Sequence, residues 1–173
     1  MIISNDAKIL SLRLGPGEDL LAGLAGVLDA QGADGGALVA AAGSLEHLAY
    51  SVVRVEADNV PRYTRIVEET GAIEITGLQG HLGREADGSA TTHVHGTFAL
   101  EDGSVRAGHV FAARVLVTVE LTVILTPDVA WQRSSLQYGA GNQMPVLLPS
   151  PRTLAPTHHK NVLDGDKLVM PKL

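Results

Sequence analysis

Hydrophobic and polar positions alternate over residues 7–14, AKILSLRL, and then take up a helical spacing. Alternation with a period of two is typical of a strand that is buried on one face, so this stretch predicts a strand. Pro16 and Gly17 end it, and the acidic residues that follow favour the first turn of a helix. A helix is predicted from about Asp19 to Gln31. Its apolar face consists of Leu20, Leu21, Leu24, Val27 and Leu28.

The next apolar stretch, ALVAAAGSL (37–45), is small and hydrophobic enough for a central strand that ends at Gly43. Another strand is predicted in YSVVRVEA (50–57). Residues 59–70 are mostly polar and show no clear period, so we expect a surface connection with at most one helical turn.

Three further β segments follow, over residues 72–82, 90–100 and 108–125, and the turn sequences EADGS and EDGS separate them. Strands dominate, and only one helix is predicted. This order favours an α+β domain with a largely antiparallel sheet, because a Rossmann fold would alternate strands and helices.

The chain changes character after residue 126. Six of the eight prolines lie between Pro127 and Pro171. We therefore expect a domain over residues 1–126 and an extended, Pro-rich C-terminal arm over 127–173, which packs on its own domain or on a neighbouring subunit.

Composition narrows the classes of function. The formal net charge is −6 and charged residues make up 18% of the chain, so a broad basic surface for nucleic acid is disfavoured. There is no cysteine, so a metal would have to bind histidine, carboxylate or water.

The N-terminus does not resemble a signal peptide, and the longest apolar run, residues 115–125, is too short for a membrane helix. A cytoplasmic location without membrane contact is expected.

Three histidines lie close together in THVHGTFALEDGSVRAGHV, residues 92–110. Side chains two apart in a strand share a face, so His93 and His95 point the same way. A two-residue turn at Asp102 and Gly103 would pair Gly96 with His109 and put His109 on the opposite face.

One extra residue would correct this register. A bulge at Gly103 or at Gly108 would pair His95 with His109 and gather the three rings on one surface. Three histidines with one open position are the ligand set of catalytic zinc sites. The alternative is a hydrogen-bonded or solvated histidine pair without a metal.

Other candidates have plainer explanations. His81 could join the cluster, although a bond to a backbone carbonyl is favoured, and His158 and His159 point opposite ways in an extended segment.

Glu120 lies in an apolar strand, where a carboxylate needs a partner. It could orient a histidine, act as a general base beside a metal, or pair with an arginine such as Arg114.

The order and spacing of these motifs resemble the plants-and-prokaryotes conserved (PPC) domain in its stand-alone prokaryotic form. The matching pieces are LRLGPGEDL, ALVAAAGSLEHL, IEITGLQGHL, ADGS, THVHGTFAL, EDGSVRAGHV and VLVTVELTVIL, and together they cover most of residues 8–126.

The resemblance implies a strongly bent antiparallel sheet, a homotrimer, and His93, His95 and His109 as ligands of a divalent metal, for which we expect zinc. Such a site would take a small anionic or carbonyl-bearing ligand, with Glu120 as the candidate base, and it suits catalysis and sensing equally.

Two alternatives remain open. The plant domains accompany AT-hooks that bind DNA, but the chain has no R-G-R-P hook, and its arginines are scattered. They are Arg54, Arg62, Arg65, Arg84, Arg106, Arg114, Arg133 and Arg152. The histidines could also be a packing or pH-sensitive feature of a structural trimer.

Overall fold

The computed structural model describes residues 2–138 and 142–152. The elements in chain order are β1 (Lys8–Leu14), α1 (Leu20–Gln31), β2 (Gly36–Ser51), β3 (Val53–Val55), β4 (Pro61–Tyr63), β5 (Val67–Arg84), β6 (Ala90–Leu100), β7 (Val105–Leu125), β8 (Val129–Tyr138) and β9 (Asn142–Pro151). No helix in this part of the chain has the length and apolar content needed to cross a membrane.

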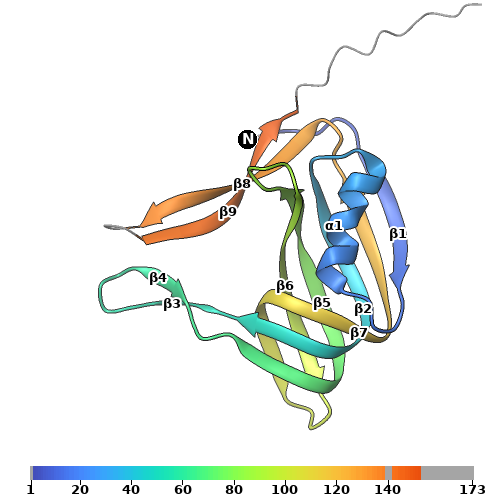
Figure 1. Ribbon diagram of the computed structural model, residues 1–173, viewed down its shortest axis with the longest axis vertical. Coiled ribbons are helices and arrows are strands. Elements are labelled where there is room, and N and C mark those ends of the chain that lie inside the picture. Colours follow the sequence, from blue (N-terminus) through green and yellow to red (C-terminus); the bar gives the residue numbers. More distant parts are fainter. Residues whose placement is uncertain (1, 139–141, 153–173) are drawn as a thin grey trace, which may run out of the picture.

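The long strands close on themselves. β2 pairs with β5 and with β7, and β6 pairs with the same two strands, so β2, β5, β6 and β7 form a ring, while β1 extends it along β7. All of these pairs are antiparallel, and register shifts interrupt β2 at several points where the strands bend (Figure 1). The mostly β architecture with one helix that the sequence predicted is confirmed.

Helix α1 covers one face of the bent sheet (Figure 1). Asp19 caps its first turn by accepting a hydrogen bond from Ala22 N at 2.8 Å, and its buried leucines are Leu20, Leu24 and Leu28. These leucines lie in the same hydrophobic cluster as Phe98 of β6, which is fully buried. Burial of this cluster stabilises the packing of α1 on the sheet that contains β6 and β7.

Two strand predictions were wrong in detail. The strand predicted at residues 37–45 does not end at Gly43, because β2 continues through this glycine to Ser51. At Gly43 the backbone of β7 comes so close that a Cβ would lie 2.0 Å from Thr118 O, so this glycine permits close strand packing and does not act as a break. The connection at residues 59–70 contains β4 and the start of β5.

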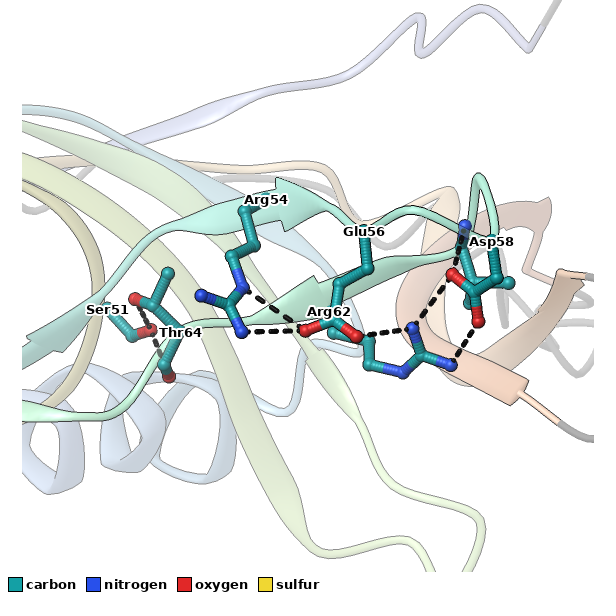
Figure 2. Close-up of polar contacts among 7 residues, drawn as sticks. Ser51, Arg54, Glu56, Asp58, Arg62 and Thr64 are labelled. Atoms are coloured by element: carbon teal, nitrogen blue, oxygen red, sulfur yellow. Dashed lines mark hydrogen bonds and ion pairs between the residues drawn. The ribbon is translucent and has the colours of Figure 1, made fainter.

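The hairpin β3–β4 projects from the end of β2 (Figure 1). Figure 2 shows that Arg62 bonds to Glu56 and, through both terminal nitrogens, to Asp58, while Arg54 bonds to the other oxygen of Glu56. At its base the buried Ser51 hydroxyl lies 2.9 Å from Thr64 O. The base of this hairpin is therefore fixed to the sheet.

The C-terminal segment begins as a second hairpin, β8–β9, so the extended arm is not found up to Pro151. A single parallel pair, Arg84 with Gln132, joins this hairpin to β5. Trp131 N also donates to Asp34 O at 2.9 Å. The hairpin thus contacts its own domain, whereas residues 153–173 of the predicted arm (127–173) lie outside the described residues.

Candidate metal centre

The register between β6 and β7 decides where His109 lies. In the structure His95 pairs with His109, and Gly96 pairs with Gly108. The loop has three residues, 101–103, since Leu100 N donates to Ser104 O at 2.9 Å. Gly103, the last of them, has a φ of 80°. This is the three-residue hairpin with a left-handed glycine, so the extra residue is at Gly103, one of the two positions predicted.

This register brings three ring nitrogens together. His93 Nε2 lies 3.1 Å from His95 Nε2, and His109 Nδ1 lies 3.4 Å from the same atom. The three residues each offer one ligand atom within 4.8 Å of the others. In a tetrahedral site with metal–nitrogen bonds near 2.05 Å, two ligand nitrogens are about 3.3 Å apart. These two separations therefore suit a shared metal ion.

Burial keeps the cluster uncharged. It is the main cause that lowers the pKa of His93 and of His95. Burial likewise lowers the pKa of His109 to about 4, with further contributions from the charges on His93, His95 and Arg133. Neutral imidazoles present the lone pairs that a metal needs, so near pH 7 the three rings are in the ligating form.

His81 lies next to the cluster without joining it. It pairs with His93 across β5 and β6, but its ring stacks on Trp131 with centroids 4.1 Å apart. Burial lowers the pKa of His81, and the backbone of Gly36 acts in the opposite direction. Its Nδ1 is buried without a hydrogen-bond partner among the described residues, so the expected bond to a backbone carbonyl stays a prediction. His158 and His159 lie outside the described residues.

Two hollows are each lined by two of the three clustered histidines. One, of about 460 Å³, is lined by His81, His93 and His95 together with small and apolar residues of β2. The other, of about 370 Å³, is lined by His93, His109 and residues from four further elements. Each hollow leaves part of the histidine cluster accessible to a small molecule.

Glu120 lies elsewhere. It is exposed on β7, where its neighbours across the sheet are Arg13 and Ala42, and it lines a hollow that contains none of the histidines. The prediction assumed a buried strand, but Val119 and Leu121 take the core side and leave Glu120 facing outward. A solvated carboxylate needs no partner, and Arg114 pairs with Glu46.

Sequence reasoning assigned no role at the site to three residues that surround it. The rings of Tyr63 and Phe111 lie 5.4 Å and 4.6 Å from that of His109. Arg133, from β8, lines the smaller hollow. Phe111 could have been found, because it is two residues from His109 and so shares its face. Tyr63 and Arg133 carry no local signal, since only the chain path brings them there.

The profile of the Plants and Prokaryotes Conserved (PCC) domain, the family called PPC above, matches residues 1–127. The chain therefore belongs to the PCC domain family. No curated protein matches the sequence. Arg133 and the rest of the β8–β9 hairpin lie beyond the matched region.

Solved structures agree with this assignment. A hypothetical protein from Salmonella matches with a TM-score of 0.67 and 22% identity, covering 87% of this chain and 98% of that one. A metal-containing protein from Archaeoglobus fulgidus matches with a TM-score of 0.65 and 25% identity, and the match covers 78% of this chain and 91% of that one. A PPC protein from Pyrococcus horikoshii matches with a TM-score of 0.65 and 20% identity, and the match covers 80% of this chain and 94% of that one. Two further similar structures, at 16% and 17% identity, are provisionally described as DNA-binding proteins.

Proposed function

We propose that the protein binds one divalent metal ion, zinc, on His93, His95 and His109, and that the open coordination position accepts a small anionic or carbonyl-bearing ligand. The observation that carries this proposal is the spacing of the ring nitrogens, 3.1 Å and 3.4 Å, on three histidines that stay neutral near pH 7. The Archaeoglobus relative at 25% identity is described as metal-containing, which supports the same reading.

The chemistry of the donor set is consistent with a first-row metal. Imidazole nitrogens suit zinc, and no thiolate is available in the sequence. When bound, such an ion would polarise a ligand oxygen or make a bound water more acidic. The chain's own residues would hold the ion through β6 and β7 and shape the hollows beside it. Glu120 takes no part in this proposal.

Self-association as a trimer belongs to the same proposal. Apolar side chains on β1 and β7 are exposed in the single chain, among them Ile9 at 68% and Val117 at 58%. A contiguous patch of such side chains would favour burial against another subunit. The molar mass in solution, measured by light scattering, would give the number of chains.

DNA binding is less well supported by this chain. Of the arginines named above, all but Arg65 form ion pairs with carboxylates in the described part of the chain. In the projecting hairpin, Arg54 and Arg62 share Glu56 (Figure 2). Because these arginines are paired and scattered, they do not form a broad basic surface for phosphates in the described part of the chain.

The test is the metal content of untagged protein purified without added metal, measured by elemental mass spectrometry. We expect about one metal per chain in the wild type and none in a His93→Ala/His95→Ala/His109→Ala variant, because imidazole supplies every ligand. The control is His47→Ala, which removes a histidine that pairs with Glu68 at 3.3 Å, outside the cluster. Metal-free wild type after dialysis against zinc would refute the proposal.

A further inference from the structure

The C-terminal hairpin places a cation beside the histidine cluster. Arg133 of β8 lines the hollow of about 370 Å³ together with His93 and His109. Its charge also contributes to lowering the pKa of His109. No residue beyond 127 belongs to the matched family region, so this arginine is a feature of the appended hairpin.

Hydrogen bonds hold the Arg133 guanidinium in place without using all of its donors. Nε donates to Glu85 Oε1 at 3.1 Å, and Nη2 donates to Thr91 Oγ1 and Thr92 O, both at 2.9 Å. A guanidinium has five N–H donors, and these bonds use three. Within the described residues no bond involves Nη1. A positioned guanidinium with donors to spare is suited to a carboxylate.

The charge balance of this hollow also calls for an anion. No aspartate or glutamate lines it in the described part of the chain. Three neutral histidines would leave a bound divalent ion with its full charge, next to a further positive charge on Arg133. Glu85 pairs with Arg133 at 3.1 Å, so the charge of the bound divalent ion would remain uncompensated. Two cations held close together in a partly buried site are stabilised by an anion between them.

Apart from Thr91 and Thr92, which bond to Arg133, the remaining lining of the hollow is apolar or aromatic. Leu21 comes from α1, Phe111 from β7 and Pro145 from β9, and Tyr63 lies against Phe111 with ring centroids 5.3 Å apart. Asn142 Nδ2 donates to Pro61 O at 2.9 Å, which ties the two projecting hairpins together near this hollow. Such a surface accommodates a small apolar body attached to the anionic group.

We infer that the hollow between β6, β7 and β8 binds a small carboxylic acid with an apolar body, whose carboxylate is recognised by Arg133 beside the metal. This inference rests on the proposed metal site and adds to it the class of ligand and the residue that selects it. Arg133 acts as a specificity determinant: it favours an anion over a neutral compound of the same shape.

A purely structural role for Arg133 is the competing explanation, because the same hydrogen bonds also attach β8 to β6. Arg152 provides a matched control. It lies at the end of the same hairpin, pairs with Asp34 at 2.6 Å, and does not line the hollow. If anchoring were the only role, loss of either arginine would have similar consequences.

The experiment uses the full-length protein loaded with Co²⁺, whose visible absorption reports changes at the metal. Benzoate is titrated against wild type, Arg133→Met, Arg133→Lys and Arg152→Met, and benzamide serves as the neutral probe of equal shape. We expect wild type and Arg152→Met to bind benzoate alike and in preference to benzamide. In Arg133→Met the benzoate affinity should fall about tenfold or more, as expected for loss of a charge-assisted hydrogen bond.

The outcomes separate this inference from the metal proposal. Cobalt content is measured in each variant, and we expect it to be unchanged. Arg133→Lys, which keeps the charge and the hairpin contact, should bind benzoate with intermediate affinity. Equal benzoate binding by wild type and Arg133→Met, or equal affinity of wild type for benzoate and benzamide, would overturn the inference while leaving the metal site intact. Failure of the wild type to bind cobalt would overturn both.

Discussion

The ring of long strands and the β8–β9 hairpin both present side chains to the histidine cluster, but they hold them by different means. His93, His95 and His109 are carried by β6 and β7, which are paired along most of their length with β5 and β2 over a buried core. Arg133 is carried by a hairpin that joins the rest of the domain through one strand pair, Arg84 with Gln132, the backbone bond from Trp131 N to Asp34 O, and a few side chains.

This difference separates two requirements. A metal site depends on atomic spacing, because a displacement of a fraction of an ångström removes a ligand, and a strand ring held in register meets that need. Recognition of a small ligand tolerates more movement and can be supplied by an added segment. The family-matched residues 1–127 contain the histidines, whereas Arg133 lies outside them.

The largest effect expected from this comparison is a loss of stability caused by a substitution in the ring of strands. Phe98→Ala removes a fully buried phenyl group from the core cluster and should lower the free energy of unfolding by about 3–5 kcal/mol. Leu136→Ala, in the hairpin and 43% exposed, should change it by less than about 0.5 kcal/mol. Urea denaturation of both variants measures the difference, and similar losses would mean that the hairpin is part of the same core.

A smaller loss is expected when the metal-free protein is acidified. The folded state keeps the pKa of His93, His95 and His109 below the ordinary value near 6.5, so the unfolded chain binds protons more readily. The contribution of these histidines to stability is complete above about pH 6.5 and is lost as the pH falls toward 4, the folded pKa of His109.

Thermal melts of metal-free wild type between pH 7.5 and 4 test this, with the triple-alanine variant as the control. The variant should show a flatter dependence on pH over this window. Parallel curves for the two proteins would show that carboxylates elsewhere, and not the cluster, govern the acid response.

The smallest and most local effect is expected at the attachment of the hairpin. Trp131→Ala removes the ring that stacks on His81 at 4.1 Å and should reduce local stability of β8 and β9 by about 1 kcal/mol. Hydrogen exchange should become faster in these two strands and remain unchanged in β2 and β7. Faster exchange throughout the ring would contradict the separation of the two regions.

Much of the fold could be read from local patterns. The alternation over residues 7–14, the helical spacing after Asp19 and the two D-G-S turns correspond to β1, α1 and the loops that flank β6. The boundaries around Gly43 and residues 59–70 were missed. A glycine in a strand can mark either a break or a close approach of backbones, and only the position of Thr118 on β7 distinguishes them.

For the candidate site, the sequence by itself determined that His93 and His95 share a face, because neighbours two apart in a strand always do. It also limited His109 to two registers. Tertiary structure decided the rest: the pairing of His95 with His109, the outward position of Glu120, and the approach of Arg133 and Tyr63. Relations across the sheet depend on how many residues each loop and bulge contains and on which faces the core buries, and these are settled only when all the strands pack together.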